Sequence, residues 1–171
     1  MQPTGFSGGT LYFAYGANLC RAHMALWCPE AVPLVRAVLP GHRLVFRPWA
    51  DMLPAPGHSV PGALYEVSAG DLAALDTFEE YPTLYERLHT RVHSDRCPFD
   101  AMAYRMTPGH DVCLPDADYL NLILQGYADW NLDAAPLASL ATRLRQDADD
   151  WTPDGALDDD PDDTGRGNAW A

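Results

Sequence analysis

The strongest constraint in this sequence is an apolar run, TLYFAY at residues 10–15, that ends directly in Gly16. A strand that is apolar on both faces must lie inside a sheet that is covered on two sides. After the glycine, Asn18 is a good helix N-cap, and LCRAHMALW is typical of a short helix that stops before Pro29. The chain is therefore expected to pass from a central strand through a tight turn into a helix.

Further strands are expected at residues 34–39 and 42–47, joined at Pro40 and Gly41, and then at 62–67, 85–94 and 100–107. The stretch 48–61 is rich in proline and glycine and predicts a long loop. Ser68 and Asp71 resemble a capping box that opens a helix at 71–80. Helical spacing recurs around 120–127 and 137–144. Strands early in the chain with helices between and after them indicate an α+β domain.

Acidic charge is concentrated at the end of the chain. The net charge is −13, and residues 147–171 hold nine Asp and one Arg, which is −8 of that total. This segment mixes Asp, Gly and Pro with few apolar residues, so it cannot bury enough surface to offset its ordering entropy. We expect one domain over residues 1–146 and an acidic, disordered C-terminal tail over 147–171.

Composition also excludes several classes of function. All eleven basic residues are Arg, so Schiff-base and P-loop mechanisms, which need Lys, are excluded. An acidic protein repels phosphate backbones and anionic lipids, so neither nucleic acid nor a membrane is an expected partner. The start of the chain has no signal-peptide pattern, and no apolar run is long enough to span a membrane, which predicts a soluble cytoplasmic protein. The four cysteines and six histidines show no metal-ligand spacing, and the histidines are interpreted as exposed.

The first candidate site is FAYGAN at residues 13–18. A strand that ends in Gly and leads into a helix N-terminus directs free backbone N–H groups at one point, where they can hold a carboxylate or an oxyanion. Gly16 permits a close approach because it has no side chain. The alternative is an ordinary strand-to-helix turn.

The second candidate site is LDTFEEYP at residues 75–82, where Asp76, Glu79 and Glu80 crowd the end of a short helix. A negative helix terminus, neighbouring like charges and burial beside Phe78 or Tyr81 all raise a carboxylate pKa toward the range of a general base. The alternative is a solvated acidic helix end. Periodicity does not say which carboxylate turns inward.

Six segments in this order resemble the γ-glutamylcyclotransferase-like family. They are YGANL at 15–19, PGHRLVF at 40–46, VPGALYEV at 60–67, LDTFEEYPTLYERLHTRV at 75–92, AMAYRM at 101–106 and PDADYLNLILQGY at 115–127. The resemblance covers roughly residues 10 to 130 and implies the family's α+β fold, a mixed, strongly curved or barrel-like β-sheet with flanking helices.

The resemblance implies a γ-glutamyl cyclotransferase. Such an enzyme cyclises a γ-glutamyl amide to 5-oxoproline with release of an amine or amino acid, and it needs no metal or cofactor. Glu79 would be the catalytic general acid/base. The small-molecule γ-glutamyl substrate would be bound by Tyr15, Gly16, Ala17, Asn18, Leu19 and Tyr119. The protein would act as a monomer or homodimer.

Two residues depart from the family's pattern. The family commonly has Ser at the position of Ala17 and Gly at the position of Glu80. A side chain at position 80 opposes a positive φ and adds a charge beside the base. The alternative function is therefore a non-catalytic member of the same fold that binds a small carboxylate or serves as a scaffold.

Overall fold

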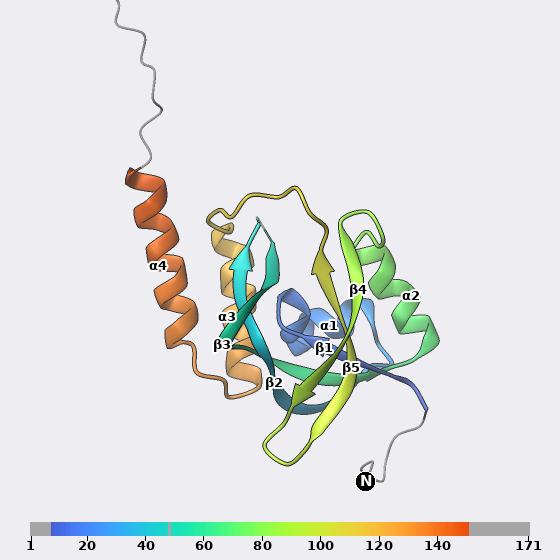
Figure 1. Cartoon of the computed structure of the whole chain (residues 1–171). Helices are drawn as coiled ribbons and strands as arrows, with labels where there is room; N and C mark the ends of the chain where they lie inside the picture. The colour runs from blue at the N-terminus through green and yellow to red at the C-terminus, as the bar shows by residue number, and fades with distance from the viewer. Residues whose placement is uncertain (1–7, 48, 151–171) are drawn as a thin grey trace, which may run out of the picture.

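The computed structural model describes residues 8–47 and 49–150, and its five described strands form a closed barrel in the order β1-β3-β2-β4-β5 (Figure 1). The strands are β1 (Thr10–Ala14), β2 (Val32–Phe46), β3 (Ala50–Val67), β4 (Tyr85–His93) and β5 (Pro98–Met106). The barrel is mixed, since β1 runs antiparallel to β3 and parallel to β5. The expected barrel-like sheet with flanking helices is confirmed.

The apolar strand β1 lies in the interior, as its sequence predicts. Its register runs from Thr10 opposite Val67 to Ala14 opposite Ala63, and its other edge meets β5 where Tyr12 faces Met102. Its last three residues are buried. Because β1 is buried where it ends, the turn that follows it also starts inside the molecule.

The prediction of a loop over residues 48–61 is wrong for residues 50–61, which belong to β3. The two predicted strands at 34–39 and 42–47 form one continuous strand, β2. β2 and β3 form a long hairpin. The register moves from Pro40 opposite Ser59 to His42 opposite Pro54, so residues 55–58 face only residue 41. This bulge holds Pro56 and Gly57, two of the five prolines and glycines in residues 48–61.

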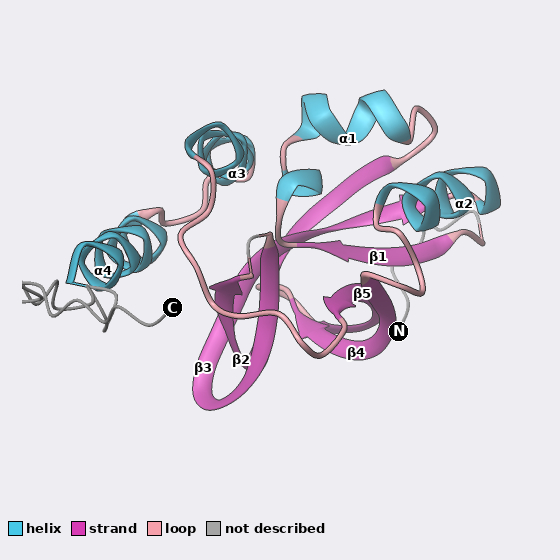
Figure 2. Ribbon diagram, turned by 90° about the horizontal axis from the view of Figure 1, so that it is seen from above, coloured by secondary structure: helices cyan, strands magenta, loops and turns pink. Residues whose placement is uncertain are grey.

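The helices are η1 (Ala17–Leu19, one 3₁₀ turn), α1 (Arg21–Trp27), α2 (Ala69–Phe78), α3 (Ala117–Asp129) and α4 (Ala135–Asp150). Figure 2 shows α1 and α2 side by side along the barrel, with α4 beside α3. Leu137 and Ala141 of α4 are buried, so this helix packs on the domain. None of the described helices is long and apolar enough to cross a membrane.

Local capping is predicted correctly at one helix and wrongly at another. Ser68 and Asp71 form the expected capping box at the start of α2. Asn18 does not cap α1, because it lies inside η1, and Cys20 is the N-cap without a side-chain hydrogen bond. At the other end of the chain, α4 extends to Asp150, four residues into the predicted tail, and residues 151–171 lie outside the described part.

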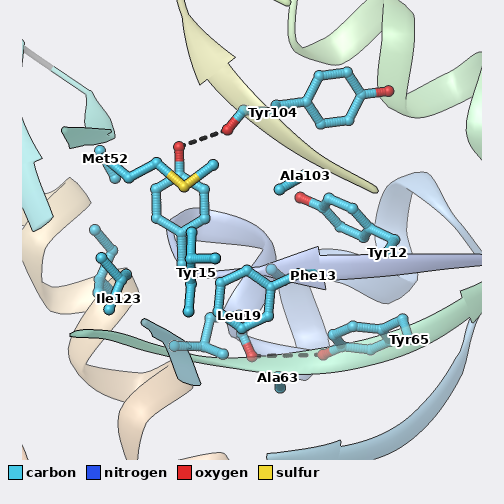
Figure 3. Packing of buried hydrophobic residues seen from close by; sticks show 14 of the residues in the cluster. Tyr12, Phe13, Tyr15, Leu19, Met52, Ala63, Tyr65, Ala103, Tyr104 and Ile123 are labelled. Carbon is cyan, nitrogen blue, oxygen red and sulfur yellow. Dashed lines mark hydrogen bonds between the residues drawn. The ribbon is translucent and has the colours of Figure 1, made fainter. Parts of the chain in front are cut away.

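The end of α3 holds η1 in place by a close backbone approach at Gly126. A Cβ at Gly126 would lie 2.7 Å from the Cys20 backbone nitrogen. Just beyond α3, the Trp130 indole donates a hydrogen bond of 2.9 Å to the Leu19 carbonyl, which also accepts one from Tyr65 at 3.5 Å (Figure 3). The turn after β1 is thus clamped between the barrel and α3.

We expect Gly126→Ala to destabilise the protein by about 2 kcal/mol, because two backbones would have to separate. For a chain of this size, that corresponds to a fall in Tm of about 4–8 °C, measured by circular dichroism. Gly70→Ala is the control, since a Cβ there meets only the Ser68 hydroxyl oxygen at 3.6 Å. Equal melting temperatures for Gly126→Ala and the wild type would contradict this account of the packing.

Candidate active site

A cavity of about 270 Å³ opens where η1, the end of α2, the tip of the β2–β3 hairpin and α3 meet. Its walls come from segments far apart in the sequence. The lining residues are Tyr12, Tyr15, Gly16, Ala17, Asn18, His23, Trp49, Ala50, Phe78, Glu79, Glu80, Leu84, Tyr85, Tyr104, Tyr119 and Leu122. Both candidate segments of the sequence therefore meet in one place.

Glu79 is the C-cap residue of α2, and its carboxylate enters the cavity beside Asn18. The Asn18 Nδ2 atom donates a hydrogen bond of 2.9 Å to Glu79 Oε1 and a second of 3.2 Å to the Tyr12 hydroxyl. Glu79 Oε2 makes no hydrogen bond to a described residue. One carboxylate oxygen is thus held in place and the other is left for a ligand.

Burial raises the pKa of Glu79 to about 8, and the hydrogen bond from Asn18 partly opposes this rise. The sequence reasoning had also invoked repulsion from Asp76 and Glu80, but desolvation is the main cause. Asp76 turns away, pairs with Arg87 and accepts a hydrogen bond of 2.7 Å from the Tyr104 hydroxyl. A carboxyl with a pKa near neutrality can both accept and donate a proton.

Asn18 keeps one unsatisfied polar atom. The residue is only 2% exposed, and its Oδ1 atom is buried with no hydrogen-bond partner among the described residues. An amide oxygen can only accept, and the Nδ2 donor of the same side chain is already committed to Glu79 and Tyr12. Together, Asn18 Oδ1 and Glu79 Oε2 therefore offer two hydrogen-bond acceptors to a ligand that carries several N–H donors.

The residues expected around the glycine turn lie at the cavity, with one exception. Tyr15, Gly16, Ala17 and Asn18 line it, whereas Leu19 is fully buried behind it. The Tyr15 hydroxyl donates a 2.7 Å hydrogen bond to the Tyr104 carbonyl (Figure 3), so this hydroxyl links the end of β1 to β5 in the barrel wall. A Cβ on Gly16 would lie 3.1 Å from the Ala50 Cβ atom and 3.2 Å from the Tyr119 hydroxyl.

Tyr119 joins α3 to the tip of the hairpin. Its hydroxyl accepts a hydrogen bond of 3.0 Å from the Ala50 amide, while the Ala50 carbonyl accepts one of 2.8 Å from Tyr85. The ring of Trp49 lies 5.0 Å from that of Tyr119. The sequence reasoning missed Trp49 and Ala50, because the segment that carries them was expected to be a loop.

His23 is a second residue that the sequence reasoning missed. It belongs to α1, lines the cavity and lies 5.4 Å from the ring of Phe78. Its Nε2 atom is buried without a hydrogen-bond partner in the described part of the chain, and burial lowers the pKa of the ring. The expectation that His23 is exposed is therefore wrong, and only its place on the helix after the glycine turn could have indicated the cavity.

The described residues hold no cluster of three His, Cys, Asp or Glu that could bind a metal ion. The lining contains no Arg. A ligand carboxylate at this site would therefore meet backbone N–H groups at the glycine turn rather than a guanidinium. The arrangement suits proton transfer by Glu79 within an aromatic pocket.

Comparisons with known proteins agree with this geometry. A family model described as "Gamma-glutamyl cyclotransferase, AIG2-like" matches residues 12–131. A mouse protein named gamma-glutamylaminecyclotransferase is 41% identical over 63 residues, which are 37% of this chain and only 39% of the mouse protein. A solved structure named gamma-glutamyl cyclotransferase shares the fold with a TM-score of 0.70 at 23% identity, over 77% of this chain and 86% of that one. A structure of an uncharacterized protein from Homo sapiens matches with the same TM-score and coverage at 25% identity.

Glu79→Gln should change the pH dependence of stability. Between its ordinary value of 4.5 and its folded pKa of about 8, the Glu79 carboxyl binds its proton more tightly in the folded chain than in the unfolded one. The stability it contributes is therefore complete below pH 4.5 and is lost as the pH rises through 8. Glutamine does not titrate, so we expect the Tm of Glu79→Gln to exceed that of the wild type by at least about 5 °C at pH 9 and hardly at all at pH 5.

The matched control is Glu86→Gln, since Glu86 pairs with Arg105 at the surface and does not line the cavity. Thermal melts at both pH values measure the difference. A Tm difference between Glu79→Gln and the wild type that stays constant from pH 5 to pH 9 would contradict the raised pKa.

Proposed function

Because the chain belongs to the gamma-glutamyl cyclotransferase, AIG2-like family, we propose that it converts a γ-glutamyl amide to 5-oxoproline and a free amine, with Glu79 as the general acid and base. The observation that carries this proposal is the desolvated carboxyl of Glu79, held by Asn18 at 2.9 Å inside the cavity. A solvated acidic helix end, the other interpretation of this segment, would not raise the pKa in this way.

The reaction is an intramolecular acyl transfer. Glu79, as the carboxylate, takes a proton from the substrate α-ammonium, and the amine nitrogen then attacks the δ-carbonyl carbon to close a five-membered ring. The protonated Glu79 returns the proton to the leaving nitrogen as the carbon–nitrogen bond breaks. The attacking nitrogen gives up its second proton to the released amine, which leaves as an ammonium, so the carboxylate is regenerated and no other reactant is needed. The protein mainly has to hold the substrate in its folded, reactive shape.

The two free acceptors of the site match the α-ammonium. Its N–H groups would meet Glu79 Oε2 and Asn18 Oδ1, the two oxygens that lack a donor among the described residues. An ammonium at this position also lowers the pKa of Glu79, so substrate binding brings the base into its ionised form. In this proposal, Asn18 Nδ2 orients the Glu79 carboxylate, and Asn18 Oδ1 accepts a hydrogen bond from the α-ammonium that Glu79 deprotonates.

The glycine turn would stabilise the oxyanion that develops on the δ-carbon. Gly16 lets the turn lie close to Ala50 and Tyr119 on the cavity wall, and we assign the N–H groups of residues 16–18 as the donors for this oxyanion and for the substrate carboxylate. A well-placed donor of this kind contributes about 3 kcal/mol to transition-state stabilisation. Ala17 adds no hydroxyl, so recognition at this position depends on the backbone.

The test is release of 5-oxoproline by the purified protein from a panel of γ-glutamyl amino acids, γ-glutamyl amines and glutathione. We expect Glu79→Gln to lower kcat by at least about 100-fold, because it cannot transfer a proton. Glu86→Gln, the surface control, should retain wild-type turnover.

In the wild type, kcat/KM should fall roughly tenfold for each pH unit below about 8, the pKa of Glu79 in the free enzyme. If the folded protein binds γ-glutamyl amides but releases no 5-oxoproline from any of them, the function is that of a binding member of the fold and the proposal is wrong.

A further inference from the structure

Asp76 lies about one helical turn before Glu79, and the reaction proposed above does not use it. Its side chain contacts the barrel and does not line the cavity. Arg87 of β4 donates a hydrogen bond of 3.0 Å from Nε to Asp76 Oδ1 and a second from a terminal nitrogen to Oδ2. The Tyr104 hydroxyl of β5 donates one of 2.7 Å to Oδ1. Arg87 and Tyr104 lie directly opposite each other in the β4–β5 pair, so both donors reach the same carboxylate.

The turn that carries Glu79 is fixed on both sides by this cluster. On the near side, the Asp76 carboxylate binds the barrel, and on the far side the Tyr81 amide donates a hydrogen bond of 2.9 Å to the Asp76 carbonyl. The guanidinium of Arg87 lies 5.0 Å from the centre of the Tyr81 ring, so it contacts both flanks of Glu79. Because Glu79 lies in a short turn that closes on Asp76, a movement of Asp76 moves Glu79 as well.

Tyr104 also contacts the other half of the site. Its backbone carbonyl accepts the hydrogen bond of 2.7 Å from the Tyr15 hydroxyl (Figure 3). Its ring packs edge-on against that of Tyr12, with the ring centres 5.9 Å apart, and the Tyr12 hydroxyl accepts the hydrogen bond from Asn18. One residue of β5 therefore contacts both the end of α2 and the segment that leads into the glycine turn.

We propose, on the basis of the function proposed above, that Asp76 is a positioning residue of the reaction. Through Tyr104 and Arg87 it holds the last turn of α2 against the barrel. This keeps the Glu79 carboxyl inside the cavity and within reach of Asn18. Asp76 transfers no proton itself and acts only through Glu79.

Small displacements matter at this site. The hydrogen bond from Asn18 to Glu79 is 2.9 Å long, and such a bond is lost when its atoms separate beyond about 3.5 Å. A misplacement of about 1 Å can lower the rate of an enzyme by about 100-fold. The contact that prevents it is partly shielded from water, since Tyr104 is 2% exposed and the Asp76 side chain 24%. A bond between a hydroxyl and a carboxylate in such a place is stronger than one between neutral groups.

The experiment measures turnover and the pKa of Glu79 in Asp76→Ala, which removes every side-chain contact of Asp76 with the barrel. We expect kcat to fall at least about tenfold, because the last turn of α2 no longer holds Glu79 beside Asn18. Water then reaches the Glu79 carboxyl, so its pKa should fall from about 8 by at least about one pH unit. The acid limb of the kcat/KM profile should move to lower pH by the same amount.

Thermal melts measure the same shift without any activity. The Tm gain that Glu79→Gln produces at pH 9 should be smaller in the Asp76→Ala background than in the wild type, because a lower pKa leaves less stability to recover. Glu80, His23 and the tyrosines of the cavity are unchanged in this comparison, so the difference reports on Glu79.

Two further variants separate positioning from stability. Tyr104→Phe removes the hydroxyl alone and keeps both the ring against Tyr12 and the carbonyl that binds Tyr15, so it should fold and lower kcat by about threefold. Glu86→Ala is the matched control, since Glu86 also pairs with an Arg directly opposite it in the β4–β5 pair but does not line the cavity. It should lose a surface ion pair and keep the wild-type kcat and acid limb.

The outcomes distinguish this inference from the function on which it rests. If Asp76→Ala and Tyr104→Phe melt at lower temperature but keep the kcat and the acid limb of the wild type, the contact serves stability alone. That result would overturn the role of Asp76 and leave the cyclotransferase intact. A wild type that releases no 5-oxoproline from any γ-glutamyl substrate would overturn the proposed function, whereas the melts still decide whether Asp76 positions Glu79.

Discussion

The hydrogen bond from Asn18 to Glu79 is the interaction on which the rest of the site depends. It joins the turn after β1 to the end of α2, two segments 61 residues apart in the chain. It orients one oxygen of the carboxylate and leaves the other free, and it commits the Asn18 amide group so that Oδ1 remains an acceptor. A single contact between two segments distant in the sequence thus sets both the position of the Glu79 carboxylate and the polarity that a ligand must match.

The tyrosines around this contact keep the cavity in shape because their hydroxyls bind backbone groups. Tyr15 donates to the Tyr104 carbonyl, and Tyr85 and Tyr119 bind the carbonyl and amide of Ala50. With these hydroxyls engaged in the walls, mostly apolar ring surface faces Glu79. The same desolvation that raises the pKa of Glu79 raises the pKa of Tyr119 to about 12, so the rings stay neutral near pH 7.

Two carboxylates close to the barrel wall are paired with Arg, whereas no Arg is among the described residues that line the cavity. Arg47 and Arg87 neutralise Asp51 and Asp76 close to the barrel wall. These pairs protect the structure from buried unpaired charge, whose cost would be high. Glu79, by contrast, has no Arg among the described residues that share its cavity.

The sequence by itself determined the elements that local rules control. They include the buried strand that ends in Gly16, the capping box at Ser68, the strands β4 and β5, and the short list of carboxylates that contains Glu79. Only the tertiary structure decided that Glu79 turns into the cavity, that Asn18 binds it instead of capping a helix, and that the proline-rich segment before Gly62 is part of a barrel strand. It also brought His23 and Trp49 to the same walls. The reason is physical, because periodicity and capping act over a few residues, whereas desolvation depends on which distant side chains pack around a group.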